Sequence, residues 1–268
     1  MYKLIALDLD GTLLKEDKTI SKKTRTAIEQ AKAKGIKIVL ATGRPTRGIE
    51  KYLKQLDLIS DDDYAVSYNG AIVQNTKSGK IIVKDTMNFS DLMSLNALSE
   101  KLNVNIHFLT LDSCYTPKWN KYSQLEADMN DVTLRIQNFE TLDNNITIIK
   151  IMFIDDAAII EEAIKHLPED LSNKFSIMRS EPYFLEFLNK GVNKSTGVSL
   201  LADILQIRPE EVICVGDAGN DIHMIKYAGL GVAMGNAFVE VKKAADYITH
   251  TNEEDGVAHV INKYILAS

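Results

Sequence analysis

The sequence predicts a doubly wound α/β fold whose parallel sheet is interrupted by an inserted α+β domain. First, the residues are 45% apolar and 25% charged, which is the composition of a globular protein, and the length of 268 residues suits one large domain or two ordinary ones. Second, short apolar runs alternate with helical patterns at both ends of the chain. Third, strand-like runs come in pairs in the middle of the chain, as in antiparallel or mixed sheets.

Nearly continuous apolar runs in the first and last thirds predict strands buried on both faces. Ser21 is placed to cap a helix that Gly35 ends, and two further helices are predicted over residues 197–205 and 221–227. The predicted strands cover residues 3–7, 36–41, 65–68, 212–215 and 231–234. Strand and helix therefore alternate as in a Rossmann-like core.

The middle of the chain has a different pattern. Two amphipathic helices are predicted near residues 90–102 and 157–167, and strand-like runs lie at 105–109, 132–136, 146–154, 175–178 and 183–187. The parallel-sheet pattern resumes near Asn193. We therefore predict a core domain of residues 1–83 and 187–268, with an inserted domain of residues 84–186.

Composition excludes several classes of protein. Lys and Arg number 31 and Asp and Glu number 37, so the formal net charge of −6 disfavours binding to nucleic acid. The only cysteines, Cys114 and Cys214, are too few for a disulfide framework. No apolar run is long enough for a signal peptide or a membrane span. We expect a cytoplasmic protein with reduced thiols and no membrane or nucleic-acid partner.

Polar clusters follow four of the predicted strands. They occupy residues 8–12 (Asp-Leu-Asp-Gly-Thr), 42–44 (Thr-Gly-Arg), 69–70 (Asn-Gly) and 216–221 (Gly-Asp-Ala-Gly-Asn-Asp). Ligands bind outside the carboxyl ends of strands in open α/β sheets, so these distant clusters are expected to converge in one crevice. Each motif alone is more often a turn or a helix cap, and only their joint occurrence in order favours a functional site.

The chemistry of these residues indicates a phosphoryl site. Asp8, Asp10, Asp217 and Asp221 would repel one another unless cations joined them or some of them stayed protonated. Carboxylate oxygens without nearby His or Cys favour Mg²⁺. Lys194 supplies a fixed positive charge, and exposed backbone N–H groups add donors for phosphoryl oxygens. The Asp8 carboxylate can also act as a covalent nucleophile.

Other candidate residues favour ordinary structural roles. The 5 histidines lack metal-ligand spacing, and Trp119, Tyr115 and Tyr122 are better explained by packing than by a substrate pocket. No Gly-x-Gly-x-x-Gly follows the first strand, which disfavours a dinucleotide cofactor.

The ordered motifs resemble those of the haloacid dehalogenase superfamily. The first motif is Asp8 to Thr12, the second Thr42, the third Lys194, and the fourth residues 216–221. Residues 184–187 (Phe-Leu-Glu-Phe), 192–194 (Val-Asn-Lys), 227–234, 236–237 (Asn-Ala) and 252–258 carry a narrower resemblance. They are similar to the Cof-type, YidA-like sugar phosphatases, and the likeness covers essentially the whole chain. The resemblance implies that the inserted domain is a large cap that closes over the site and reads the leaving group.

The same resemblance implies a role for each matching position. Asp8 attacks phosphorus and becomes an aspartyl phosphate, and Asp10 protonates the leaving alkoxide and then activates water. Mg²⁺ is held by the Asp8 carboxylate, the Asp10 backbone carbonyl and Asp217, while Asp221 orients Lys194. The candidates for substrate contact are Arg44 and Asn69. Phosphoryl oxygens are bound by the Leu9 backbone, Thr42, Gly43, Lys194 and Asn220.

We therefore expect a Mg²⁺-dependent phosphatase that acts on small sugar phosphates. Another phosphorylated metabolite, such as FMN or pyridoxal phosphate, is an alternative substrate. A phosphomutase is disfavoured because residues 11–21 are too few for the small helical cap of those relatives. A phospho-switch module is disfavoured because receiver domains are about half this length. The sequence leaves the oligomeric state open.

Overall fold

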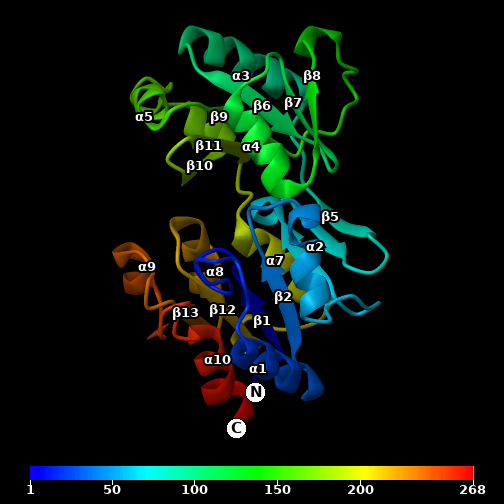
Figure 1. Ribbon diagram of the computed structural model, residues 1–268, viewed down its shortest axis with the longest axis vertical. Coiled ribbons are helices and arrows are strands. Elements are labelled where there is room, and N and C mark those ends of the chain that lie inside the picture. The colour runs from blue at the N-terminus through cyan, green and yellow to red at the C-terminus, as the bar shows by residue number, and fades with distance from the viewer. Residues whose placement is uncertain (268) are drawn as a thin grey trace. The chain divides into compact units, whose positions relative to one another are not determined.

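The computed structural model describes residues 1–267, which form two compact units (Figure 1). The core unit comprises Met1–Gly43, Glu50–Lys84 and the chain from Asn193 onward. The inserted unit comprises Asp85–Val192 together with the short segment Arg44–Ile49. The bounds predicted from the sequence, residues 1–83 and 187–268 for the core domain and residues 84–186 for the inserted domain, remain a prediction.

The core unit contains an 8-stranded sheet in the order β14-β13-β12-β1-β2-β3-β4-β5. The six strands from β14 to β3 run parallel, and β4 and β5 continue the sheet in antiparallel fashion. The predicted α/β class with a parallel core is thereby confirmed. The strand bounds are β1 Leu4–Leu7, β2 Lys37–Ala41, β3 Tyr64–Ser67, β4 Ile72–Asn75, β5 Ile81–Lys84, β12 Val212–Gly216, β13 Leu230–Ala233 and β14 Tyr247–Ile248.

Helices bury apolar side chains against this sheet. Val198 and Leu201 of α7 pack with Leu4, Val39 and Cys214 in one buried cluster. Each buried side chain of this size stabilises the fold by ~1.5–3 kcal/mol. The helices of the core unit are α1 Lys22–Ala33, α7 Lys194–Ile204, α8 Ile222–Tyr227, α9 Val239–Ala244 and α10 Gly256–Ile261, and α2 Thr46–Gln55 belongs to it from Glu50 onward.

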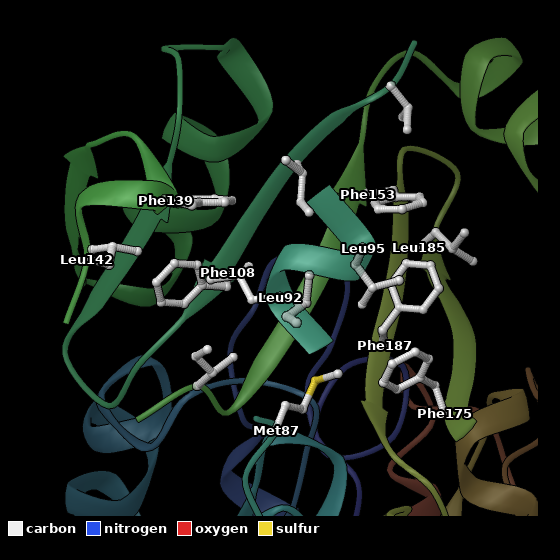
Figure 2. Close-up of a cluster of buried hydrophobic side chains, with 14 of the residues drawn as sticks. Met87, Leu92, Leu95, Phe108, Phe139, Leu142, Phe153, Phe175, Leu185 and Phe187 are labelled. Atoms are coloured by element: carbon white, nitrogen blue, oxygen red, sulfur yellow. The ribbon is translucent and has the colours of Figure 1, made fainter. Parts of the chain in front are cut away.

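The inserted unit is built on a 6-stranded sheet in the order β10-β11-β9-β6-β7-β8. Its neighbouring strands are antiparallel except β7 and β8, which run parallel. Phe108, Phe153 and Phe187 project from this sheet into a cluster with Leu92 and Leu95 of α3 (Figure 2). The strands are β6 Asn105–Leu109, β7 Ser113–Thr116, β8 Thr133–Ile136, β9 Lys150–Ile154, β10 Phe175–Glu181 and β11 Phe184–Asn189; the helices are α3 Phe89–Lys101, α4 Lys121–Asn130, α5 Ala157–Lys165 and α6 Leu171–Lys174.

The sequence pattern did not predict helix α4. Its buried positions include Ser123, Glu126 and Asn130, which are polar. A helix with such a buried face has no apolar periodicity to reveal it. Helix α7 also begins at Lys194, three residues earlier than predicted, because the Asn193 side chain accepts a hydrogen bond from Thr196 N and so caps it.

Other expectations concern absences and single residues. Cys114 and Cys214 are both free and buried. Among residues 1–267, no helix combines the length and apolarity needed to cross a membrane. Trp119 is 60% exposed, whereas Tyr115 stacks on Phe108 with ring centroids 4.9 Å apart.

Candidate active site

The polar residues predicted to converge lie at one edge of the core sheet. Asp8 follows β1, and its backbone N donates to Val215 O of β12 at 3.0 Å. Thr42 follows β2, and its N donates to Val66 O of β3 at 2.9 Å. Because these strands are parallel, their carboxyl ends meet at the same edge. The sheet thus places the ends of four strands from distant stretches of the chain side by side.

Three carboxylates gather at this edge. Asp8, Asp217 and Asp221 each offer an oxygen, and these oxygens all lie within 4.8 Å of one another. Lys194 Nζ lies 2.5 Å from Asp8 Oδ1 and 2.7 Å from Asp221 Oδ1, and the lysine is 1% exposed. The cluster therefore carries more negative than positive charge when all three carboxylates are ionised.

Asp221 uses both carboxylate oxygens for structure. Its Oδ1 accepts from Lys194 Nζ, while its Oδ2 accepts from the backbone N of Asp217 at 2.9 Å and of Ala218 at 3.0 Å. A buried carboxylate with its oxygens engaged in this way fixes its neighbours. Asp221 therefore orients Lys194 and holds the loop that carries Asp217.

Gly11 lets the first motif approach the fourth. Its φ is +80°, and a Cβ at this position would collide with the Asp217 carboxylate. Thr12 Oγ1 donates to Asp217 Oδ1 at 2.9 Å, and Asn236 Nδ2 donates to Gly11 O at 2.8 Å. Only glycine combines this backbone conformation with the space required.

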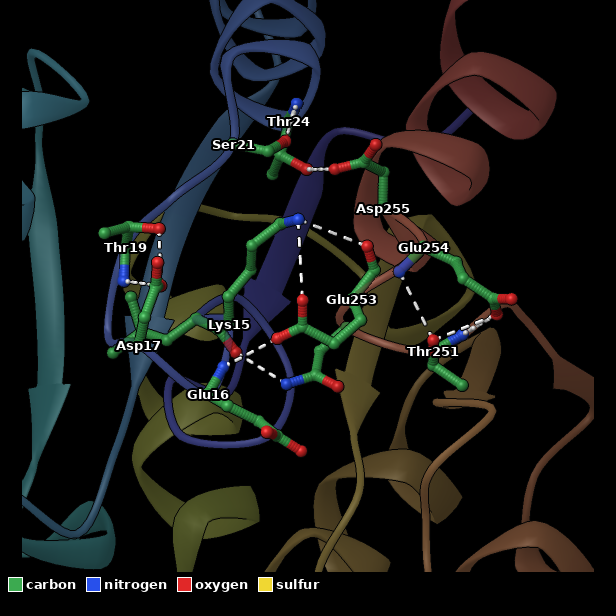
Figure 3. Close-up of polar contacts among 12 residues, drawn as sticks. Lys15, Glu16, Asp17, Thr19, Ser21, Thr24, Thr251, Glu253, Glu254 and Asp255 are labelled. Carbon is green, nitrogen blue, oxygen red and sulfur yellow. Dashed lines mark hydrogen bonds and ion pairs between the residues drawn. The ribbon is translucent and has the colours of Figure 1, made fainter.

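The C-terminal segment fastens the loop that follows Asp8 (Figure 3). Lys15 Nζ donates to Glu253 O at 3.3 Å, and Glu16 N donates to Glu253 Oε1 at 2.8 Å. Asn252 Nδ2 also donates to Leu14 O at 2.8 Å. Residues that lie more than two hundred positions later in the chain therefore help to hold the loop of the first motif.

Burial and mutual repulsion shift the acidity of the cluster. Burial, followed by the charge of Asp221, raises the pKa of Asp8 well above its usual range, and Lys194 lowers it in part. The same two causes raise the pKa of Asp217 to about 6. Burial lowers the pKa of Lys194, but the Asp221 and Asp8 carboxylates outweigh it and hold that pKa above its ordinary value. A further cation would relieve this repulsion.

Thr42, Asn69 and Asn220 form a second hydrogen-bonded group. Asn69 N donates to Thr42 O at 2.9 Å, and Asn220 Nδ2 donates to Asn69 Oδ1 at 3.0 Å. Asn69 is fully buried, and its φ of 54° is left-handed, a conformation that asparagine tolerates better than most residues. A Cβ on Gly43 would lie 3.1 Å from Asn69 Nδ2, so Gly43 and Asn69 are closely packed.

A comparison with known proteins identifies the family. Residues 5–261 match the haloacid dehalogenase-like hydrolases. The chain belongs to this family. Relatives from Bacillus subtilis include YxeH, named as a candidate phosphatase (42% identical over 100% of both chains), and the 5-amino-6-(5-phospho-D-ribitylamino)uracil phosphatase YitU (33% identical over 97% of both).

Solved structures give the same result. A haloacid dehalogenase-like hydrolase from Bacteroides thetaiotaomicron is 38% identical, with a TM-score of 0.87 over 98% of this chain and 99% of its own. The subclass IIB sugar phosphatase BT4131 is 30% identical, with a TM-score of 0.81 over 98% of each chain. The predicted superfamily is confirmed, and this chain is one of its phosphatase-like members.

Within this haloacid dehalogenase-like hydrolase, the predicted site residue Asp10 is not one of the three clustered carboxylates. The Asp10 side chain is 39% exposed, and its Oδ1 accepts from Lys18 Nζ at 2.8 Å. Arg44 is half-buried and belongs to the inserted unit. Leu9 is fully buried, which leaves its backbone as its polar group.

Two positioning residues were missed from the sequence. Thr12 supports Asp217, and Asn236 supports Gly11. Thr12 already stood inside the first motif, so its hydroxyl was a usable signal. Asn236 follows β13 directly after Gly235, in a stretch that also holds Gly229 and Gly231, but nothing in this local pattern points to Gly11.

Proposed function

We propose that this protein is a cytoplasmic, Mg²⁺-dependent phosphatase that hydrolyses small sugar phosphates through an aspartyl-phosphate intermediate. The observation that carries the proposal is the buried Asp8 carboxylate, which lies against Lys194 and beside Asp217. A buried nucleophile next to a fixed cation suits attack on an anionic phosphoryl group.

The reaction has two steps on this chain. A carboxylate oxygen of Asp8 bonds to phosphorus as the bond from phosphorus to the sugar oxygen breaks, and Asp10 gives that oxygen a proton. Asp10 then takes a proton from water, whose oxygen attacks phosphorus and releases phosphate and the Asp8 carboxylate. The partly exposed Asp10 is suited to exchange this proton with solvent.

The acidic residues fit a magnesium ion. Asp8 and Asp217 are hard oxygen ligands in a buried cluster with excess negative charge, and the Asp10 backbone carbonyl is the proposed third ligand. Asp221 is a supporting residue, because Lys194 and two backbone N–H groups already engage its oxygens. When bound, the ion would offset negative charge on the transferred phosphoryl group.

The phosphoryl oxygens are assigned to donors around Asp8. These donors are Lys194, Asn220, and Thr42 with Gly43. The Leu9 backbone completes the set. Buried Asn69 supports Asn220 through their hydrogen bond and so contributes indirectly. Such preorganised donors stabilise charge spread over the transferred group.

The relatives support the substrate class. BT4131 is named as a sugar phosphatase, and YitU as a phosphatase of a ribitylamino uracil phosphate. We propose that Arg44 contacts the hydroxylated leaving group here. FMN and pyridoxal phosphate are the alternative substrates that a panel must include.

A substrate panel with Mg²⁺ tests the proposal. Phosphate release is measured with p-nitrophenyl phosphate, glucose 6-phosphate, fructose 1-phosphate, ribose 5-phosphate, glycerol 1-phosphate, FMN and pyridoxal phosphate. We expect hydrolysis of the sugar phosphates and its loss on chelation with EDTA. Asp8→Asn preserves side-chain volume and should lower kcat by at least about 1,000-fold, because it removes the nucleophile.

Two outcomes would contradict this function. Near-normal turnover by folded Asp8→Asn would exclude Asp8 as the nucleophile. A phosphorylated protein that persists for hours with Mg²⁺ would favour the phospho-switch alternative, since Asp10 should hydrolyse the intermediate quickly.

A further inference from the structure

The inserted unit buries three charged side chains that the proposed chemistry does not use. Lys150, the first residue of β9, is 2% exposed, and Glu126 of α4 and Glu186 of β11 are 4% and 3% exposed. Lys150 Nζ lies 3.5 Å from Glu126 Oε1 and 3.1 Å from Glu186 Oε1. Ser180 Oγ donates to Glu186 Oε1 at 2.6 Å.

Helix α4 is attached to the sheet by polar contacts. Lys150 holds it through Glu126, and one turn earlier His107 Nδ1 lies 2.9 Å from Ser123 Oγ. Asn120 caps the helix by accepting from Ser123 N at 2.7 Å. Hydrogen bonds and ion pairs specify direction more sharply than apolar contacts do. The rotation and register of α4 are therefore set by these buried polar side chains.

The segment Arg44–Ile49 rests on this helix. A Cβ on Gly48 would lie 2.9 Å from Asn130 Oδ1 and 3.3 Å from Asn130 Cα, so Gly48 packs closely against the end of α4. Burial raises the pKa of Glu126; Lys150 opposes this rise, and the positive charge of Arg44 adds a smaller opposing effect across the segment that packs on α4. Arg44 also follows Thr42 by only two residues in the chain.

Charges therefore alternate from Glu186 to Lys150, then to Glu126 and Arg44. Removing such a row of ions from water is costly, and a protein with apolar side chains of similar volume in these places would often be no less stable. We propose that Glu126, held in place by Lys150, is a positioning residue that sets the direction of the Arg44 guanidinium toward the leaving group of the substrate. This rests on the proposed function, in which Arg44 makes that contact.

A double-mutant cycle tests the positioning role. The quantity measured is kcat/KM for the panel's fastest-hydrolysed sugar phosphate divided by kcat/KM for p-nitrophenyl phosphate, which lacks sugar hydroxyls. Glu126→Gln keeps the volume and removes the charge. We expect it to lower this ratio by about tenfold, mainly through KM for the sugar phosphate. Lys150→Met should do the same, and Lys150→Arg should restore part of the loss.

The Arg44→Ala background separates positioning from general damage. If Glu126 acts through Arg44, then Glu126→Gln should lower the ratio no further in that background. Glu162→Gln, at an exposed glutamate of α5, is the matched control and should leave the ratio within twofold. Thermal unfolding of each variant shows whether it is folded.

Three results would overturn the inference. They are an unchanged ratio in folded Glu126→Gln, an equal loss for both substrates, and an undiminished effect in the Arg44→Ala background. Failure of the proposed function would be seen in a different measurement. In that case the hydrolysis of p-nitrophenyl phosphate would survive the Asp8→Asn substitution or the addition of EDTA. The double-mutant cycle, in contrast, compares only how the two leaving groups are recognised.

Discussion

One lysine faces three aspartates in the core unit, and this imbalance shapes the candidate site. Lys194 contacts Asp8 and Asp221 directly, while Asp217 is supported by the Thr12 hydroxyl. Burial, and then the charge of Asp221, raise the pKa of both Asp8 and Asp217. A divalent cation has both a place and an electrostatic reason to bind here.

At the residue scale, Gly11→Ala should destabilise the protein more than Gly35→Ala. The two glycines have similar φ values, +80° and +83°, but a Cβ on Gly11 would meet Asp217 whereas one on Gly35 has no neighbour within 4 Å. We expect a loss of about 1 kcal/mol for Gly35→Ala from backbone strain, and about 2–3 kcal/mol for Gly11→Ala. Urea unfolding measures both, and equal losses would mean that the loop accommodates the methyl group.

His107 predicts a pH dependence of stability. Burial, with a smaller contribution from Lys150, lowers its pKa to about 3. Below pH ~6.5 the unfolded chain binds a proton at His107 and the folded chain does not. The stability that the neutral His107 contributes is therefore fully present above that pH and declines as the pH falls toward 3. Acidification from pH 7 to pH 5 should therefore lower the free energy of unfolding by about 2 kcal/mol through His107.

The measurement compares urea unfolding of wild type and His107→Gln at the two pH values. The variant should lose less stability on acidification by about that amount. His223→Gln, at an exposed histidine, is the control and should behave like wild type. If His107→Gln and wild type lose stability in parallel, then either the folded protein also protonates His107 or proton uptake by another group sets the pH dependence of unfolding.

At the element scale, the start of α7 couples helix capping to the active site. Asn193 Oδ1 accepts from Thr196 N at 3.2 Å, and Lys194 is the first helical residue. Gly70 approaches Asn193 O so closely that a Cβ there would collide with it. Any displacement of this cap moves the backbone that carries Lys194.

Asn193→Ala should therefore cost both stability and activity. We expect about 1 kcal/mol of unfolding free energy and at least about a tenfold loss of kcat for p-nitrophenyl phosphate. Ser21→Ala removes a comparable cap on α1, where Ser21 Oγ accepts from Thr24 N at 3.0 Å, and should cost stability alone. Similar kcat values for the two variants would show that the cap does not position Lys194.

At the scale of the whole molecule, the inserted unit has its own core and closed ends. Its buried cluster draws only on residues between Met87 and Phe187. Asn189 Nδ2 donates to Asp85 Oδ1 at 2.5 Å and to Thr86 O at 2.6 Å, which joins the two ends of the insertion. Such an insertion has the features of an independently folding domain.

Residues 85–192, expressed alone, should fold. Circular dichroism should show native-like secondary structure with one cooperative urea transition, although the segment Arg44–Ile49 is absent. Phe108→Ala in this fragment removes a fully buried ring and should cost about 3–5 kcal/mol, enough to unfold it. A fragment without a cooperative transition would show that the unit needs the core to fold.

Much of the fold was predictable from local patterns. The apolar runs marked β1, β2, β12 and β13, and the confirmed parallel sheet follows from their alternation with helices. Helix α4 was not predictable, since its buried face is polar and becomes meaningful only opposite Lys150 and His107. The position of such a helix is decided by polar contacts with residues elsewhere in the fold and not by a periodic pattern along the chain.

The sequence by itself determined the family and the chemical types gathered at the strand ends, because motif order and strand polarity are properties of the chain. Only the tertiary structure decided that the second carboxylate oxygen of Asp221 accepts from the backbone N of Asp217 and Ala218, and that Asn236 supports Gly11. Hydrogen bonds between residues far apart in the chain depend on distances of a few tenths of an ångström. Residue order cannot encode those distances until the sheet and its loops have brought the partners together.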